Sequence, residues 1–411
     1  MPATSFAGLA LVALVGFAVP LVLGFVPALR LPSVVLEIVV GILIGPSVLH
    51  WVTVDQPIAI VSLLGLALLL FLSGLELDLD RLRGRVLRVT GLAFLLSFGI
   101  ALVVGYGLGA LGLIHAPLLV AIILVATSLG IVIPLLKDAG EISSDFGQLT
   151  IAGASIADFG AIILLSLFFS RQATGIGAQL VLLGGFALLA VVVAIALTRT
   201  ERSMRLSTVL LRLQDTTAQI RVRGAFVLLV AFAAFAERLG LEVILGTFIA
   251  GAILALVDRD QMMTHGQFRT KLEAVGFGIF IPIFFVTSGI RFDLAALLAH
   301  PSTIALVPVF LVALLVIRGV PALLYRPLVG GRRTIVAGLL QATSLPFIVA
   351  ASQIGLELGV LTQATAAALI ATGLLSVLIF PLGALSLLRR AQPVPAGSPP
   401  SAMGQQVQAE S

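Results

Sequence analysis

The chain has 411 residues, of which 60% are hydrophobic and only 10% are charged. A soluble domain of this length does not carry so much apolar sequence, so the composition predicts an all-α polytopic membrane protein. The net charge of +5 does not indicate nucleic-acid binding, because the basic residues occupy short loops between apolar runs. With no cysteine, and with four histidines that share no ligand spacing, thiol chemistry is excluded and a transition-metal centre or other cofactor is not expected.

About thirteen apolar runs are long enough to be expected to span a bilayer. They fall near residues 5–27, 33–50, 57–75, 88–111, 117–136, 147–169, 175–198, 222–237, 241–257, 272–290, 303–323, 334–354 and 361–387. The tail, residues 391–411, is rich in Pro, Ser and Gln and is expected to be disordered on the cytoplasmic side.

The loops between these runs differ strongly in their basic residues. Most of the 24 Lys and Arg residues fall in one set of alternate loops, whereas the other set holds only Arg171, Arg238 and Arg291. Cytoplasmic loops are the basic ones, so we expect the N-terminus outside and the C-terminus inside. The longest basic loop, residues 199–223, is expected to join two halves along the inner leaflet.

Asp158 is the one charged residue in the sixth run. It lies about eleven residues from either end, so roughly 16 Å of helix separates it from each surface. A carboxylate at that depth costs roughly 2.5–3.5 kcal/mol, and intramembrane acids mark ion and proton pathways. The alternative is a neutral or hydrogen-bonded Asp that only joins packed helices.

Two short motifs recur at nearly the same offset. Residues 73–79 (SGLELDL) resemble residues 288–294 (SGIRFDL), and ATSL occurs at both 126–129 and 342–345. Each offset is close to 215 residues and moves the pattern by seven predicted spans. Because seven is odd, the two copies face opposite ways across the bilayer, and inverted repeats of this kind are typical of secondary transporters.

The second motif is where the fifth and twelfth spans are expected to break. Pro134 and Pro346 lack a backbone N–H, so the carbonyls of Gly130 and Ala342 lose their helical partners. Hydroxyl groups lie beside both carbonyls, at Thr127, Ser128, Thr343 and Ser344. A kinked but continuous helix is the alternative at each position.

Crossed half-helices leave partial charges of both signs inside the membrane. Asp158 and Arg318 are the candidates to balance them, although Arg318 lies near the predicted cytoplasmic end of the eleventh span and could instead snorkel. Glu37 and Glu76, toward the inside face, are interfacial charges or line an entry funnel.

Three motifs carry a family resemblance: residues 37–49 (EIVVGILIGPSVL), 71–78 (FLSGLELD) and 284–293 (FFVTSGIRFD). Together they resemble the monovalent cation:proton antiporters of the bacterial sodium/proton and potassium-efflux type, over about residues 5–387. The resemblance implies an inner-membrane protein with a mobile core that includes 88–169 and 303–387, two crossed broken helices, and a scaffold that forms a homodimer. It also implies that Asp158 binds the ion near Thr127, Ser128 and Ser155, and that Arg318 is the basic residue of the corresponding helix.

Two positions depart from the pattern of that family. Ala157 stands where a polar residue usually precedes the key aspartate, and Gly153 stands where some exchangers carry an acid that pairs with the basic residue. The ion site is therefore expected to contain one ionisable carboxylate. A cytoplasmic nucleotide-binding domain, common in the potassium-efflux members, is not expected in this chain.

The resulting hypothesis is exchange of Na⁺ or K⁺ for H⁺ at Asp158, with one proton per cation and no net charge movement. The nearest alternative is a sodium-coupled symporter of a small organic anion, with Arg318 as its anchor. An intramembrane aspartyl protease would need a second buried aspartate, and no enzymatic activity is expected. A sensor without transport activity is the remaining alternative.

Overall fold

In the computed structural model the chain is helical throughout the residues that the structure describes, which are 6–25, 32–76, 84–169, 176–201, 219–257 and 266–389. This confirms the predicted all-α class. Two segments with sequence predictions fall outside the described residues: the tail 391–411 and most of the basic loop 199–223.

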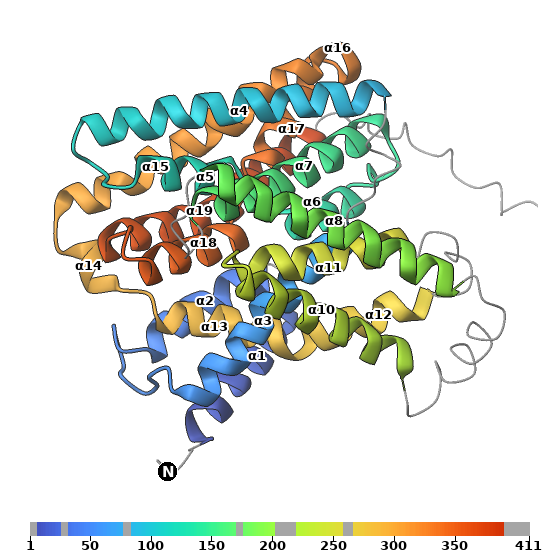
Figure 1. Ribbon diagram of the computed structural model, residues 1–411. Helices are drawn as coiled ribbons and strands as arrows, with labels where there is room; N and C mark the ends of the chain where they lie inside the picture. The colour runs from blue at the N-terminus through green and yellow to red at the C-terminus, as the bar shows by residue number, and fades with distance from the viewer. Residues whose placement is uncertain are drawn as a thin grey trace, which may run out of the picture.

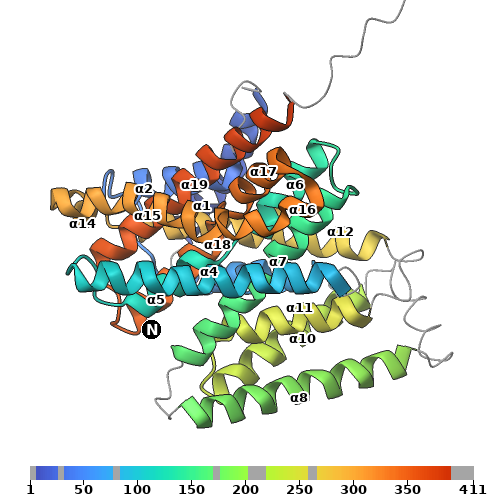
Figure 2. The same cartoon turned by 90° about the horizontal axis from the view of Figure 1, so that it is seen from above.

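The helices form two groups, and each packs mostly within itself. The first group, in the lower part of Figure 1, consists of α1 (Ala7–Phe25), α2 (Ser33–Ile44), α3 (Gln56–Leu75), α10 (Ile220–Arg238), α11 (Val243–Val257), α12 (Gly266–Val275), the π-helical turn Gly276–Phe280 and α13 (Ile281–Ile290). Helix α8 (Ile176–Glu201) lies at the outer edge beside α10 and α11, as seen in Figure 2, and packs on α11 and α7.

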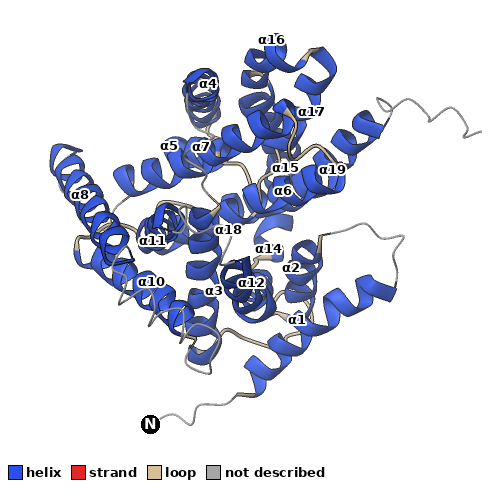
Figure 3. Ribbon diagram, turned by 90° about the vertical axis from the view of Figure 1, so that its right-hand side faces the viewer, coloured by secondary structure: helices blue, strands red, loops and turns tan. Residues whose placement is uncertain are grey.

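The second group lies in the upper part of Figure 1 and surrounds the two broken spans. It consists of α4 (Gly84–Ala110), α5 (Pro117–Val125), α6 (Leu129–Asp138), α7 (Asp145–Phe168), α14 (Leu294–Leu298), α15 (Pro301–Gly319), the 3-10 turn Pro321–Tyr325, α16 (Arg326–Val329), α17 (Gly331–Gln341), α18 (Pro346–Glu357) and α19 (Gln363–Arg389). Figure 3 shows the two groups on opposite sides of the molecule.

Each of the thirteen predicted spans coincides with a helix or a pair of half-helices. By length and composition, ten described segments are able to cross a membrane, and α2 and α11 are shorter apolar helices. The bounds differ locally. The second predicted span, 33–50, ends as a helix at Ile44, and the eleventh continues past its predicted end at 323 to Val329.

Helix starts follow from local capping. Asp55 precedes α3 and its carboxylate accepts a hydrogen bond from the N–H of Ile58 at 3.0 Å. Ser144 precedes α7 and its hydroxyl accepts from the N–H of Gly147 at 3.0 Å. Both side chains satisfy a backbone donor that the first turn of a helix leaves without an internal partner.

The two broken spans have the predicted arrangement, and both breaks lie in the ATSL motif as expected, but Pro134 does not interrupt the first of them. The fifth span is interrupted at residues 126–128, and Pro134 lies inside the continuous helix α6. Gly130 lies in the first turn of α6. In the twelfth span Pro346 stands at the start of α18, after a break at residues 342–345. A proline is tolerated in the first turn, where its missing N–H has no helical partner to lose.

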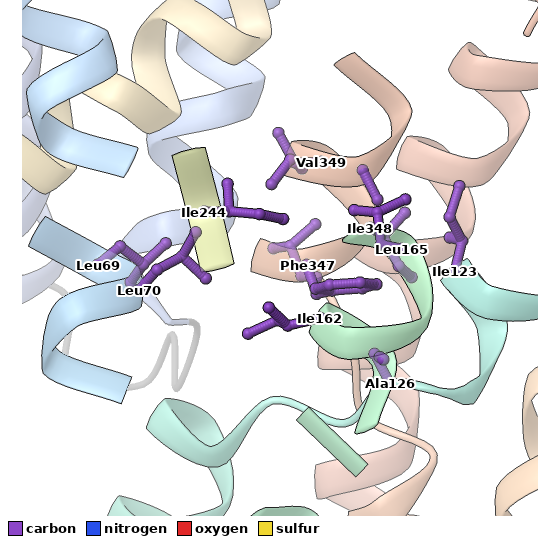
Figure 4. Close-up of a cluster of buried hydrophobic side chains, with 14 of the residues drawn as sticks. Leu69, Leu70, Ile123, Ala126, Ile162, Leu165, Ile244, Phe347, Ile348 and Val349 are labelled. Carbon is purple, nitrogen blue, oxygen red and sulfur yellow. The ribbon is translucent and has the colours of Figure 1, made fainter. Parts of the chain in front are cut away.

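An apolar layer separates the two groups near the middle of the bundle. Figure 4 shows Leu69 and Leu70 of α3 and Ile244 of α11 facing Ile162 of α7 and Phe347 of α18. All five side chains are buried and belong to one continuous hydrophobic cluster. Water and ions are excluded from such a layer while it stays packed.

Within the first group, helices α3 and α11 approach closely at two glycines. A Cβ added to Gly251 would lie 1.9 Å from the carbonyl oxygen of Phe71, and one added to Gly74 would lie 2.1 Å from that of Phe248. These distances are far below van der Waals contact, and the atoms met are backbone atoms that cannot rotate away. Small residues that bring backbones together are the usual basis of helix packing in membranes.

We therefore expect Gly251→Ala to lower the stability of the purified protein by about 1–3 kcal/mol, because the helices must separate to admit the methyl group. Thermal unfolding in detergent measures the effect. Gly91→Ala on α4 is the matched control, since nothing lies within 4 Å of its added Cβ. Equal melting temperatures for the two variants would contradict the close approach.

Candidate ion-binding site at the crossing of two broken helices

The two breaks contact each other directly. The N–H of Ser128, in the first break, donates to the carbonyl of Thr343, in the second, at 2.9 Å. The hydroxyl of Thr127 donates to the carbonyl of Gln341 at 2.7 Å. The repeated ATSL segments thus meet at one point, where α5 and α17 end and α6 and α18 begin.

Asp158 approaches this crossing from α7. One carboxylate oxygen accepts from the N–H of Thr127 at 3.2 Å, and the other accepts from the N–H of Leu129 at 3.3 Å. These donors stand at the start of α6, where the helix carries partial positive charge. Asp158 is only partly buried, whereas the neighbouring Ala157 is fully buried.

Arg318 reaches the same crossing from α15 and is 1% exposed, so its side chain does not snorkel to a surface. Its Nε donates to the hydroxyl of Thr127 at 2.9 Å, Nη1 to Ser97 at 3.1 Å, and Nη2 to the side-chain oxygen of Gln341 at 3.1 Å. Longer contacts of 3.5 Å reach the backbone carbonyls of Gln341 and Gly153. The guanidinium therefore lies at the C-terminal, partly negative end of α17.

Thr127 joins the two charged residues. Its N–H donates to Asp158, while its hydroxyl accepts from Arg318 and donates to the carbonyl of Gln341. It is fully buried. A single residue of the first break therefore contacts the carboxylate, the guanidinium and the end of the opposite half-helix.

Most of the other predicted polar residues form hydrogen bonds to the backbone of their own helix or to a neighbouring helix. Ser155 donates to the carbonyl of Ile151 in its own helix at 3.0 Å, and Thr343 donates to Leu339 at 3.2 Å. The backbone of Ser344 is held by Ser376 of α19, which accepts from its N–H at 3.2 Å and donates to its carbonyl at 2.9 Å. Gly130 and Pro134 are exposed and do not line the crossing.

The two candidate funnel acids occupy different places. Glu76 follows the last residue of α3, lies 3.7 Å from Arg269, and is close enough to Asp158 for its charge to act there. Glu37 lies on α2, is 3% exposed, and shares a hydrogen bond with Ser33. The structure brings Glu76, and not Glu37, into the electrostatic surroundings of Asp158.

A cavity of about 250 Å³ lies between the two groups, near the N-terminal ends of α3 and α11. Ser62, Thr247, Glu242 and Glu357 are among its lining residues, and Asp158 is not. Ser62 and Glu76 are separated by about 21 Å along α3. The cavity and Glu76 therefore lie on opposite sides of the apolar layer.

Sequence reasoning missed three residues that hold Arg318 in place: Ser97, Gln341 and Tyr325. The amide nitrogen of Gln341 donates to the hydroxyl of Tyr325 at 2.9 Å. All three side chains are buried. Gln341 immediately precedes the second ATSL motif, and a polar amide within that apolar run is a signal that could have identified it.

A partly buried carboxylate and a buried guanidinium at the crossing of two inverted, broken spans define a secondary transport protein. The sequence matches the family described as "Sodium/hydrogen exchanger, transmembrane" over residues 9–389, and the chain belongs to this family. It is thus a multi-pass membrane protein of the cation:proton antiporter type.

Individual relatives agree with this assignment. The chain is 31% identical over 405 residues to the putative Na(+)/H(+) antiporter YjbQ of Bacillus subtilis, a match that covers 95% of this chain and 64% of the relative. It is 29% identical to the glutathione-regulated potassium-efflux system protein KefC of Klebsiella pneumoniae, over 70% of this chain and 45% of that one. The solved structure of the sodium proton antiporter MjNhaP1 from Methanocaldococcus jannaschii superimposes with a TM-score of 0.68 at 17% identity, and the match covers 93% of this chain and 98% of MjNhaP1.

Removal of the guanidinium should destabilise the crossing. In Arg318→Ala, the buried acceptors on Thr127, Ser97 and Gln341 lose their donor, so we expect a loss of about 3 kcal/mol or more in the free energy of unfolding. Thermal unfolding of the purified protein without added cation measures this. Arg88→Ala, at an exposed position of α4, should be neutral. Unchanged stability of Arg318→Ala would contradict the contacts described here.

Proposed function

We propose that this chain exchanges a monovalent cation, Na⁺ or K⁺, for H⁺, and that the two ions compete for the carboxylate of Asp158. One observation carries the proposal: a partly exposed carboxylate sits at the crossing and accepts two backbone hydrogen bonds from the start of α6. Removal from water favours the neutral, protonated carboxyl, whereas a bound cation favours the ionised form. Each ion therefore displaces the other.

The ion would be held by oxygen atoms near that carboxylate. Alkali cations prefer oxygen ligands, and Thr127, Ser128 and Ser155 carry hydroxyl groups around the break and one turn before Asp158. Glu76, whose charge reaches Asp158, would attract cations from the face predicted to be cytoplasmic. The cavity beside Glu242 and Glu357 would provide the corresponding approach from the other face.

Coupling follows from the apolar layer between the two groups. An ionised, empty carboxylate must leave water to pass that layer, which is costly, while a protonated or cation-bound carboxylate is neutral at that point. We propose that residues 88–169 and 303–387 move as the core against the remaining helices, which hold a homodimer in the bilayer. The N-terminus would lie outside and the C-terminus in the cytoplasm.

The charges of Arg318 and Asp158 also determine how many protons would be exchanged per cation. Arg318 keeps its proton at physiological pH and balances charge without adding a transported proton. The site then carries the same charge whether Asp158 holds H⁺ or a monovalent cation. One proton per cation, with no net charge movement, is the consequence.

The arrangement of Arg318 counts against a sodium-coupled symporter of an organic anion. Such a transporter needs a cation that faces the substrate, and this guanidinium is buried and already donates to Thr127, Ser97 and Gln341. A protease would require a second aspartate beside Asp158. The fully buried polar side chains of the described residues include no such aspartate.

Substitution of the carboxylate tests the proposal directly. Asp158→Asn keeps an oxygen acceptor but cannot ionise, so we expect proton-coupled cation flux in everted vesicles to fall to background. Asp55→Asn is the matched control, because an asparagine also caps a helix start, and it should transport normally. Exchange retained by Asp158→Asn would move the ion site elsewhere.

Electroneutrality has its own test. In proteoliposomes that contain the wild-type protein, an imposed membrane potential without a cation or proton gradient should drive no exchange, because both loaded states carry equal charge. A fluorescent pH indicator inside the vesicles reports proton movement. Flux that follows the sign of the potential would show an unequal stoichiometry.

A further inference from the structure

Among the described residues, no carboxylate accepts a hydrogen bond from the guanidinium of Arg318. Its hydrogen-bond acceptors are the hydroxyls of Thr127 and Ser97, the side chain and carbonyl of Gln341, and the carbonyl of Gly153. Ion pairs of other described arginines, such as Arg269 with Glu76 and Arg333 with Glu141, lie elsewhere. A buried arginine usually pairs with an acid, because an uncompensated charge is costly away from water.

Gln341 supplies the acceptor that a carboxylate would otherwise provide. Its side-chain oxygen lies 3.1 Å from Nη2 of Arg318, and its amide nitrogen donates to the hydroxyl of Tyr325 at 2.9 Å. If the amide were reversed, its NH₂ group would face the guanidinium, donor against donor. The donor-only guanidinium therefore requires the oxygen of Gln341 to face it, and the buried Tyr325, 1% exposed, accepts the amide N–H that this orientation directs away from Arg318.

Space for this pair exists because position 153 is glycine. A Cβ at Gly153 would lie 2.4 Å from the amide nitrogen of Gln341 and 2.5 Å from the hydroxyl oxygen of Tyr325. Any side chain on α7 at this position would displace one of the two groups. The hydrogen bond between Gln341 and Tyr325 therefore depends on the lack of a side chain at Gly153.

We propose that Gln341 and Tyr325 are the positioning residues for Arg318, and that their neutral hydrogen bonds leave its full positive charge to act on the ion site at Asp158. This inference rests on the proposed exchange function. A formal carboxylate beside Arg318 would cancel that charge. The neutral amide holds the guanidinium in place while its charge still lowers the proton and cation affinities of Asp158.

The test converts the amide into a carboxylate. Gln341→Glu has nearly the same shape and keeps an oxygen toward Arg318, and Tyr325 can donate to it instead of accepting. Exchange is measured in proteoliposomes with Na⁺ and K⁺ in parallel, from neutral to alkaline pH. We expect the pH of half-maximal exchange to move about one unit alkaline, because the proton is held more tightly by Asp158. At the alkaline limit, where protons no longer compete, the apparent KM for the cation should fall.

A merely structural role for Gln341 predicts a different result. It would lower the maximal rate at every pH and leave both the midpoint and KM unchanged, and that outcome overturns the proposal. Gln363→Glu, at the exposed first residue of α19, is the control and should behave as wild type. Absence of exchange by the wild-type protein overturns the proposed function together with this inference. Wild-type exchange without the alkaline shift overturns this inference alone.

Tyr325→Phe supplies a second readout, measured first in the wild-type background and then in the Gln341→Glu background. Loss of the hydroxyl leaves the buried amide N–H of Gln341 without its acceptor and weakens the hold on Arg318, so we expect the maximal rate to fall about fivefold. In the Gln341→Glu background the same change should cost less than about twofold, because a carboxylate has no N–H that needs this acceptor. Tyr106→Phe, at an exposed position of α4, is the control. A rate unaffected by Tyr325→Phe, or an equal loss in both backgrounds, overturns the proposal.

Discussion

Backbone groups that lose their helical partners inside a membrane must find others, and the crossing of the two breaks depends on this constraint. Asp158 accepts from the N–H groups of Thr127 and Leu129, the N–H of Ser128 donates to Thr343, and Arg318 lies at the carbonyl end of α17. The start of α6 therefore meets a negative charge, the end of α17 meets a positive one, and the two breaks bond to each other. Under the proposed function, the carboxylate that satisfies the backbone also binds the ion, which would link the stability of the crossing to transport.

The packing around the crossing supports the ion exchange proposed for Asp158. An apolar layer formed by residues such as Leu69, Ile244 and Phe347 separates the two helix groups (Figure 4), with Glu76 on one side and a cavity of about 250 Å³ on the other. A layer of this kind blocks an ionised group far more than a neutral one. In the proposed exchange, the chemistry at Asp158 determines which ion is bound, and the packing around it determines when the bound state can change sides.

Hydrophobic runs, loop charges and the repeated ATSL motif predicted the all-α class, the spans and the inverted pair of broken helices. The first break lies in the ATSL motif as predicted, but Pro134 is not its cause: the N–H groups of Thr127 and Ser128 donate to Asp158 and to the carbonyl of Thr343 and stabilise an extended segment two turns before the proline. The contribution of Gln341, Tyr325 and Ser97 was also hidden, since these residues lie on different helices and meet only through Arg318. Gly153 was noted only as a missing acid; the structure adds that its lack of a side chain makes room for the pair that takes the acid's place. Roles in ion binding stay predictions for Thr127, Ser128 and Ser155.

The central claim, that a proton and an alkali cation occupy one carboxylate in turn, is tested most directly by the number of protons released when the cation binds. Purified wild-type protein in a weakly buffered solution, at a pH where the site is protonated, is titrated with Na⁺ or K⁺ while calorimetry follows binding and a pH electrode follows release. The account predicts one proton released for each cation bound, with a ratio that falls toward zero as the solution is made alkaline. Cation binding that releases no proton at any pH would contradict it.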